Sequence, residues 1–188
     1  MTCYRGDSIQ RFGIKYPLYL DSSMLSSSEI NKLNRVRSKK IIVQNICSRE
    51  GGIFATVSKP EEVSLDTVTN ITLEENEYLE YFTALLNSKI SNFFMIFVVY
   101  LNSNFAMHTD KTYIGEIPII IPTKEQLWII NDIFNKLSSI HNKYSSEFFE
   151  EYGRLNKVLY EIYKLTNEDI LVIEESLKDI MSKKQNGG

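Results

Sequence analysis

Apolar and polar side chains alternate in short runs along the first half of the chain, which is the pattern of β-strands. Three such runs are rich in β-branched residues: 40–46 (KIIVQNI), 52–58 (GIFATVS) and 67–73 (TVTNITL). Gly51 and Gly52, where the chain enters the second run, predict a hairpin turn. The order of these runs predicts a small, mainly antiparallel sheet.

Smaller elements are predicted before this sheet. Residues 16–21 (YPLYLD) are expected to form a short edge strand, because Pro17 has no N–H group to donate to a neighbouring strand. A run of serines further along predicts the start of a short helix, with Ser28 as its N-cap.

From Asn76 onward, apolar side chains recur every three or four residues, which is the spacing of one helix face. They are Tyr78, Tyr81, Phe82, Leu85, Leu86, Ile90, Phe93, Phe94 and Phe97. This spacing predicts one helix at the centre of the core. The longest apolar run, 93–101, has nine residues, whereas a helix that spans a bilayer needs about 20. We therefore expect a buried element and no membrane anchor, followed by loop and strand over 102–122.

The last third of the chain predicts long helices. Thr123 and Gln126 form a capping box, in which each side chain accepts a hydrogen bond from the other residue's backbone N–H. Beyond them an apolar heptad seam carries Leu127, Ile130, Phe134, Leu137, His141, Tyr144, Phe148, Glu151, Leu155, Val158 and Ile162. We expect His141 to pack in this seam. A seam of this length needs a partner helix, either another protein's or the chain's own helix predicted after Thr166.

These elements together predict an α+β fold. A small twisted, mainly antiparallel sheet packs with a central helix, and long C-terminal helices follow as a helical arm or hairpin. The predicted boundaries are an α/β domain over 1–122, a helical spacer or docking region over 123–182, and a disordered tail over 183–188.

Charge is distributed unevenly along the 188 residues. Residues 1–60 hold 10 Lys and Arg against 4 Asp and Glu, whereas the remainder holds 11 against 20, which together give the net charge of −3. A basic N-terminal third favours contact with a polyanion. Two cysteines and no signal peptide are typical of a reducing cytoplasm.

Known catalytic patterns are missing from the sequence. His108 and His141 stand 33 residues apart, without cysteine or acidic partners at metal-ligand spacing. The sequence contains no Gly-rich phosphate loop and no Pro-Pro pair. These observations favour a protein that binds its target over one that transforms it, and they predict neither a metal nor a cofactor in this chain.

Several stretches in a fixed order resemble a known family. They are 5–12 (RGDSIQRF), 37–58 (RSKKIIVQNICSREGGIFATVS), 76–95 (NEYLEYFTALLNSKISNFFM), 110–126 (DKTYIGEIPIIIPTKEQ) and the closing 155–177 (LNKVLYEIYKLTNEDILVIEESL). The chain resembles the C-terminal specificity domain of TaqI-like adenine DNA methyltransferases and of single-chain type IIG restriction–modification enzymes. It is also similar to the target recognition domains of type I specificity subunits.

This resemblance implies a non-catalytic domain that binds double-stranded DNA sequence-specifically in the cytoplasm of a bacterium or archaeon. Its partner would be a methyltransferase or endonuclease domain, in the same or a companion polypeptide, which would hold S-adenosylmethionine. The family's Asn-Pro-Pro-Tyr motif, which handles a flipped adenine, is absent here. The alternative is a structural or assembly module whose helical arm contacts another protein.

A domain that reads DNA needs cations for phosphates and planar polar groups for base edges. The candidate phosphate-binding residues are Arg35, Arg37, Lys39, Lys40, Arg49, Arg11, Lys15 and Lys111, with Arg5 as a further cation. The candidate base-reading residues are Gln44, Asn45, Ser48, Asn104 and His108, with Asn102 in the same loop. The resemblance itself transfers no base contact, because members of the family read different sites.

Overall fold

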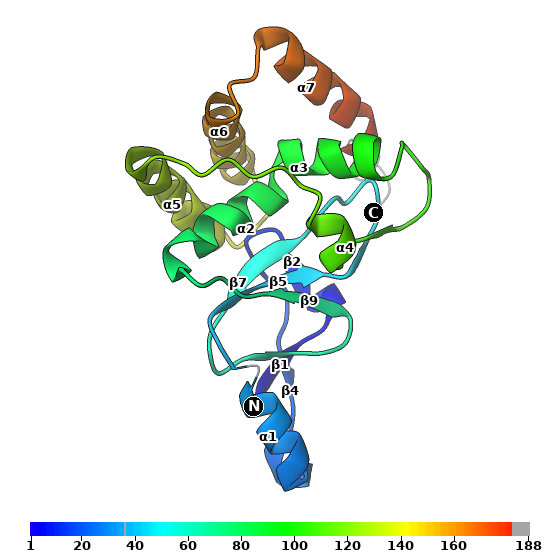
Figure 1. Cartoon of the computed structure of the whole chain (residues 1–188), viewed down its shortest axis with the longest axis vertical. Coiled ribbons are helices and arrows are strands. Elements are labelled where there is room, and N and C mark those ends of the chain that lie inside the picture. The colour runs from blue at the N-terminus through cyan, green and yellow to red at the C-terminus, as the bar shows by residue number, and fades with distance from the viewer. Residues whose placement is uncertain (36, 182–188) are drawn as a thin grey trace.

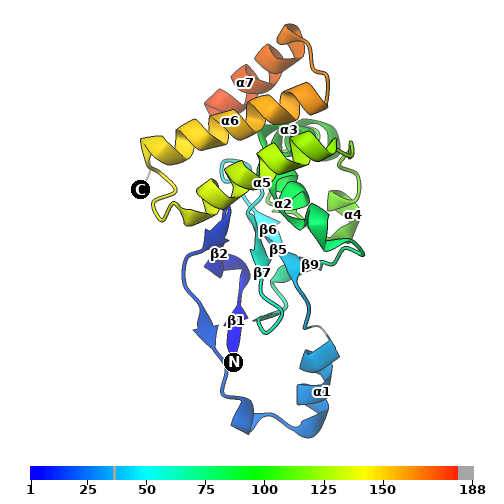
Figure 2. The same cartoon turned by 90° about the vertical axis from the view of Figure 1, so that its left-hand side faces the viewer.

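The computed structural model describes residues 1–35 and 37–181, without the side chains of Arg35, Asp179 and Met181. The predicted disordered tail, 183–188, therefore lies outside the described residues, as does the candidate side chain of Arg35. A layer of helices lies above a central sheet, and the N-terminal strands and helix α1 extend below it (Figures 1 and 2).

The described residues form ten short strands and a set of helices. The strands are β1 (Thr2–Tyr4), β2 (Ile9–Gln10), β3 (Gly13–Ile14), β4 (Leu18–Tyr19), β5 (Lys40–Gln44), β6 (Ile46–Cys47), β7 (Ala55–Ser58), β8 (Val63–Ser64), β9 (Val68–Ile71) and β10 (Met107–His108). The α-helices are α1 (Ser27–Arg35), α2 (Leu79–Asn87), α3 (Lys89–Phe93), α4 (Lys111–Ile114), α5 (Lys124–Ser139), α6 (Ser146–Ile162) and α7 (Asn167–Met181). Three 3₁₀ turns, η1 (Gly6–Ser8), η2 (Ser22–Met24) and η3 (Asn76–Tyr78), and one π-helix, η4 (Phe94–Val99), complete the set.

Strand β5 is the centre of the main sheet, whose order is β7-β5-β9 with both pairs antiparallel. Alternate side chains of a strand point to opposite faces. Ile41 and Val43 accordingly join the main buried cluster under the helices, whereas Ile42 joins a second cluster with Tyr4 and Ile9. The apolar run in β5 is therefore continuous because both faces of the strand are covered.

The predicted mainly antiparallel arrangement is confirmed. The predicted strand at 16–21 is β4, which lies at the edge of the sheet β4-β1-β8. The pairing of β1 with β8 is parallel. Ile46, the last residue of the predicted strand run 40–46, is 51% exposed, because the chain leaves β5 at Asn45 and continues in the separate strand β6.

The predicted central helix is present but broken. Helix α2 ends at Asn87, and Ser88 has the extended backbone of an N-cap, with its hydroxyl accepting a hydrogen bond from the Ser91 N–H. The two arms, Asn76–Asn87 and Lys89–Val99, meet at 51°. Within the described residues no single helix is long and apolar enough to cross a membrane, although this bent pair passes on length and composition.

Two buried asparagines join this break to the sheet. The Asn87 side chain accepts from the Ala55 N–H at 3.1 Å and donates to the Ala55 carbonyl at 2.9 Å. Asn92 Oδ1 accepts from the Ile53 N–H at 2.8 Å. Because β7 is an edge strand, these side chains satisfy backbone groups in it and just before it that no neighbouring strand pairs with. The Ala55 carbonyl also accepts from the Phe12 N–H at 3.1 Å.

The capping box at Thr123 and Gln126 is confirmed at the start of α5. The heptad seam beyond it, however, is divided between two helices, α5 and α6, which pack side by side (Figure 2). His141 was expected to pack in the seam, and this prediction is wrong: the residue lies in the turn between the helices and is exposed.

The chain itself covers most of the seam. Ile130, Leu137, Leu155 and Phe148 are at most 1% exposed and belong to the main buried cluster. That cluster contains residues from both sides of residue 122. The domain boundary at 122 stays a prediction. A spacer or docking role for 123–182 would need a seam that the chain itself leaves uncovered, so the structure does not support this role.

Predicted caps elsewhere are right at one helix and shifted at another. The Thr166 hydroxyl accepts a hydrogen bond from the Asp169 N–H before α7, as expected. At α1 the residue that accepts from the Glu29 N–H is Ser26, not Ser28, because the helix begins at Ser27.

Lys143 lies in the turn between α5 and α6 and is 9% exposed. Its ammonium donates to the Leu137 and Ser138 carbonyls near the end of α5 and lies 5.4 Å from the centre of the Phe148 ring. A cation at this position is stabilised by the negative end of the α5 helix dipole. Burial lowers the pKa of Lys143 from 10.5 to about 8.

We expect Asn87→Ala to lower the free energy of unfolding by about 2–4 kcal/mol, because it leaves the buried Ala55 N–H without a partner and removes a donor from its carbonyl. Urea denaturation followed by circular dichroism measures this change. Asn135→Ala, on the exposed face of α5, is the matched control and should change stability by less than about 0.5 kcal/mol. Equal effects of the two substitutions would contradict the role assigned to Asn87.

Lys143 makes stability depend on pH. Between about pH 8 and 10.5 the unfolded state holds this proton and the folded state does not. The free energy of unfolding therefore rises with pH in this range. The free energy of unfolding of the native protein, relative to Lys143→Met, should therefore increase by about 2 kcal/mol from pH 7 to 9.5. Lys157→Met, at an exposed lysine of α6, should show no such trend. If the difference in free energy of unfolding between the native protein and Lys143→Met does not change with pH, the ammonium is not desolvated.

Candidate nucleic-acid interface

The structure distributes the candidate residues over three places. Lys40 and Gln44 are the two ends of β5, which lie about 13 Å apart at the rise of a strand. The cations that precede β5 are therefore separated from the polar residues that follow it. Arg11 and Lys15 lie at a third place, beside a cavity described below.

At the far end of β5 the fold brings two distant segments together. Strands β6 and β10 pair with Cys47 opposite Met107 and Ile46 opposite His108. This pairing places the segment after β5 beside the loop before α4. The residues concerned are called the polar loop cluster here: Gln44, Asn45, Ser48, Arg49, Asn102, Asn104, His108 and Lys111.

Thr109 fixes the distance between the two segments. Its N–H donates to the Asn45 carbonyl at 2.8 Å, and its hydroxyl donates to the Gln44 carbonyl. The Asn45 N–H in turn donates to the Thr67 carbonyl at 3.1 Å. Thr109 thus ties the end of β10 to the end of β5, independently of the side chains of the polar loop cluster.

Arg49 holds the tip of the loop with its forked guanidinium. Nη1 donates to Asn104 Oδ1 at 3.0 Å, and Nη2 donates to Asn102 Oδ1. Leu101 and Asn102 adopt left-handed backbone angles, φ 48° and 61°, which residues other than glycine adopt rarely. Two asparagines from the loop are therefore oriented by one arginine from the opposite segment.

Tyr100 supports the other side of the loop. Its hydroxyl accepts from the His108 N–H at 2.7 Å and donates to the His108 carbonyl at 3.0 Å. The Tyr100 and Tyr113 rings lie 5.1 Å apart, and the His108 imidazole stacks on Tyr113 at 6.5 Å. Lys111 is exposed at the start of α4, where Asp110 is the N-cap.

Two of the base-reading candidates are partly engaged by the fold. The Ser48 hydroxyl accepts from the Gly51 N–H at 3.0 Å. The Asn45 side-chain oxygen is buried without a hydrogen-bond partner. Asn102, Asn104, His108 and Lys111 are exposed members of the cluster, and Gln44 and Arg49 are partly exposed.

The cations before β5 differ in accessibility. Arg37 is exposed, and Lys39 forms an ion pair with Glu80 at 2.9 Å. Lys40 is only 1% exposed, its ammonium lies 3.4 Å from the Glu62 carbonyl, and burial lowers its pKa. The expectation that Lys40 belongs to an exposed phosphate-binding rim does not fit this burial, because the side chain faces into the protein.

Arg11 is also held inside the fold. Its guanidinium lies 5.5 Å from the ring centres of both Phe54 and Tyr152, and Nη2 donates to the Gly51 carbonyl at 2.7 Å. Lys15 is exposed at the rim of the same cavity. An arginine between two rings is oriented by the protein and is not free to follow a DNA backbone.

Several residues beside or within the polar loop cluster have no signal in the sequence. Phe105 and Leu101 are 82% and 81% exposed beside the polar loop cluster. Tyr100 and Thr109 position its backbone. The pattern of a surface loop contains no signal for such roles, because they depend on the pairing of β6 with β10.

The polar loop cluster presents a guanidinium, primary amides, an imidazole and an ammonium on one surface. Such groups form hydrogen bonds with the edges of bases and with phosphate oxygens. Among the side chains that the structure describes, no group of three or more His, Cys, Asp or Glu residues is arranged to hold a metal ion.

Comparisons with known proteins agree with the arrangement of segments. The profile of the TaqI-like C-terminal specificity domain matches residues 1–119. A comparison with curated proteins gave no match. Among solved structures, the type IIL restriction–modification enzyme MmeI in complex with DNA matches with a TM-score of 0.61 and 15% identity. The match covers 96% of this chain and 31% of the MmeI chain, and at this identity it shows the fold.

We expect Arg49→Ala to loosen the loop tip, because both side-chain contacts of the fork are lost. Two hydrogen bonds at about 1 kcal/mol each predict amide hydrogen exchange faster by about 10-fold or more over residues 101–106, with little change in β5. Arg154→Ala on α6, which removes an exposed arginine and its ion pairs with Asp132 and Glu151, is the control. Unchanged exchange over 101–106 in Arg49→Ala would show that the fork does not hold the loop.

Proposed function

The chain belongs to the family of TaqI-like C-terminal specificity domains, and from this premise we propose that it binds double-stranded DNA sequence-specifically. In this proposal it is the target recognition domain of a type IIG-like restriction–modification enzyme. Methyl transfer, DNA cleavage and S-adenosylmethionine binding would belong to a catalytic domain in the same or a companion polypeptide. This chain spans 31% of the MmeI chain that it matches.

The observation that carries the proposal is the assembly of the polar loop cluster. Residues 44–49 and 102–111 are far apart in the sequence, and β6 and β10 bring them to one surface. Arg49 orients Asn102 and Asn104 before any ligand binds. Pre-oriented polar groups lose less conformational freedom when they bind, which favours a surface that discriminates between sequences.

Roles within the cluster follow from the chemistry of the side chains. Arg49 suits guanine or a phosphate, and Asn104 or Gln44 suits adenine, which offers one donor and one acceptor in the major groove. Lys111 is a point charge suited to phosphate. The exposed Phe105 and Leu101 could contact the methyl group of thymine. Arg37 and Lys39 would meet phosphates at the other end of β5.

The alternative function, an assembly module with a projecting helical arm, has no supporting observation. Its basis is a heptad seam without a partner, and most of the seam residues lie in the chain's own buried cluster or pack against it. DNA recognition is therefore the function that the arrangement supports best.

The proposal predicts DNA binding that weakens steeply with salt. Fluorescence anisotropy with random-sequence duplexes should give a linear fall of log K with log salt. Arg49→Gln with Lys111→Gln should reduce the slope by about 2 if both side chains contact phosphates, and by about 1 if Arg49 reads a base. Lys124→Gln with Lys157→Gln, the same charge change on exposed lysines of α5 and α6, is the matched control.

Selection from a randomised duplex pool, followed by sequencing, tests base reading separately. Asn104→Ala and Gln44→Ala should each relax the preference at a small number of positions, at a cost of about 1–3 kcal/mol per lost base contact. The control pair Lys124→Gln and Lys157→Gln should retain the native preference. Duplex binding reduced equally by the cluster pair and the control pair would reject the polar loop cluster as the interface.

A further inference from the structure

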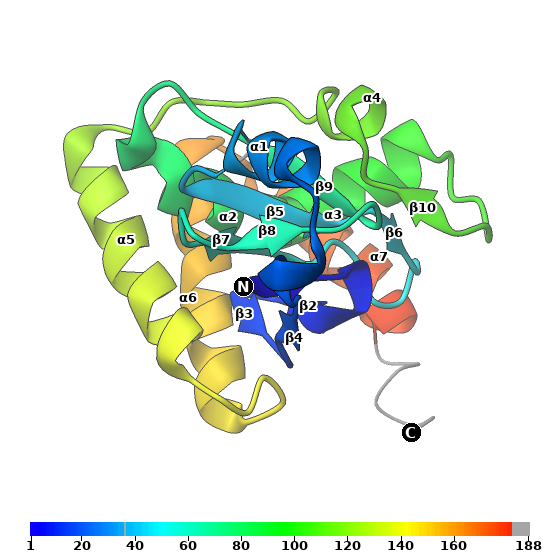
Figure 3. The same cartoon turned by 90° about the horizontal axis from the view of Figure 1, so that it is seen from below.

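A second candidate site lies on the other side of the turn at Gly51. A cavity of about 1030 Å³ opens between the hairpin of β2 and β3, the first half of α6, and α7. In the view from below, β2 and β3 lie between α6 and α7 (Figure 3). Small-molecule sites in proteins have volumes of roughly 300–1,000 Å³, so this cavity is large enough for one.

Two cations at the cavity have no carboxylate partner among the side chains that the structure describes. Arg11 lies between the Phe54 and Tyr152 rings, its Nη2 binds the Gly51 carbonyl, and its Nε is buried without a partner. The Lys143 ammonium binds carbonyl groups at the end of α5. Buried charges in proteins are usually paired, because removing them from water is costly.

Two of the donors at the cavity, Gln10 and Lys143, are close to one another. A Cβ added to Gly13 would lie 3.4 Å from Gln10 Nε2 and 3.7 Å from Lys143 Nζ. The amide and ammonium donors therefore face the same small space beside β3. Burial alone lowers the pKa of Lys143, with no carboxylate raising it. A bound anion would compensate this charge.

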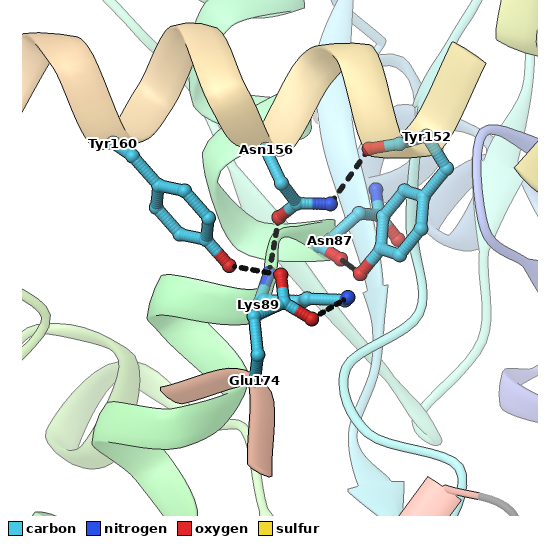
Figure 4. A network of polar contacts seen from close by, with 6 residues as sticks. All are labelled: Asn87, Lys89, Tyr152, Asn156, Tyr160 and Glu174. Atoms are coloured by element: carbon cyan, nitrogen blue, oxygen red, sulfur yellow. Dashed lines mark hydrogen bonds and ion pairs between the residues drawn. The ribbon is translucent and has the colours of Figure 1, made fainter. Parts of the chain in front are cut away.

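The remaining charges at the cavity are partly neutralised within the fold. Lys89 and Glu174 form an ion pair, and the Tyr160 hydroxyl donates to the other oxygen of Glu174 at 2.8 Å (Figure 4). Lys15 and Lys178 add exposed cations, whereas Glu50 and Glu175 add acidic groups. Cations thus outnumber carboxylates at a cavity of a chain that is negative overall.

Aromatic side chains supply the rest of the wall. Phe148 and Tyr152 are buried and stack at 6.0 Å, and Phe149 and Tyr144 at the cavity are 42% and 73% exposed. Exposed aromatic rings beside cations are suited to stack on a nucleobase while the cations bind its phosphate. A peptide carboxylate would use the cations but not these rings.

We propose that this cavity binds one nucleotide, with its phosphate at Lys143, Gln10 and Arg11 and its base against the Phe149 ring. The nucleotide is either free or an unpaired nucleotide of a DNA strand, because the volume suits a single nucleotide and not a duplex. The site is distinct from the polar loop cluster. The two share only the turn at 48–52, where Arg11 contacts the Gly51 carbonyl.

Isothermal titration calorimetry of the full chain tests this site with AMP, adenosine and inorganic phosphate as probes. We expect AMP to bind at least 10-fold more tightly than either adenosine or phosphate. Lys143→Met should weaken AMP binding by about 10-fold or more, and Phe149→Ala by about 5- to 100-fold, as expected for the loss of one stacking contact. Thermal unfolding confirms that each variant is folded. If Lys143→Met does not fold, Phe149→Ala, at a partly exposed residue, still tests the site.

Trp128→Ala is the matched control, since Trp128 is 73% exposed on α5 and does not line this cavity. It should leave the affinity for AMP unchanged. The variant with Arg49→Gln and Lys111→Gln should also bind AMP normally, so the failure of DNA recognition and the failure of this site are distinguishable. Absence of AMP binding, or equal binding of AMP and inorganic phosphate, would overturn the proposal.

A short single-stranded oligonucleotide identifies the source of the nucleotide. Binding of the oligonucleotide much more tightly than AMP, and weakened by Phe149→Ala, would assign the site to an unpaired nucleotide of DNA. Comparable affinities would assign it to a free nucleotide. Oligonucleotide binding that Phe149→Ala and Lys143→Met leave unchanged would place that strand elsewhere and overturn its assignment to the cavity.

Discussion

The need to satisfy buried backbone groups at the edge of β7 is the constraint on which the structure depends. A sheet edge under a helical layer has no water to bond its N–H and carbonyl groups. Asn87 and Asn92 take the place of a neighbouring strand by binding Ala55 and Ile53. The helix break at Ser88 lies between these two asparagines. The Tyr152 hydroxyl from α6 donates to the Asn87 carbonyl at 2.8 Å (Figure 4).

The same contacts position the two surfaces that we connect with function. The Gly52 backbone has φ +68°, and a Cβ there would lie 2.2 Å from Asn92 Oδ1, so only glycine fits. Arg11 thus holds the turn at 48–52 through Gly51, and Asn92 holds Ile53 directly after it. Arg49 projects from the outer side of this turn to the polar loop cluster, and Gly51 lines the cavity on the other side.

Local features of the sequence predicted the fold well where the interaction itself is local. The capping box at Thr123 involves residues three apart, and the strands 40–46, 52–58 and 67–73 contain β5, β7 and β9. The heptad seam failed at His141 because two packed helices have the same apolar period as one continuous helix. The two arrangements differ in the turn between Ser139 and Ser146, and the spacing of apolar residues does not reveal this turn.

The sequence by itself determined the kinds of side chain available, the sheet and helix content, and the order of segments that identifies the family. Tertiary structure decided which of those side chains act together. It buried Lys40 and enclosed Arg11 between rings, and it joined Arg49 to Asn102 and Asn104 across more than fifty residues. Hydrophobic period and charge are properties of neighbours along the chain. Contacts between distant segments depend on strand pairing and on the burial of polar groups, which arise only when the whole chain packs.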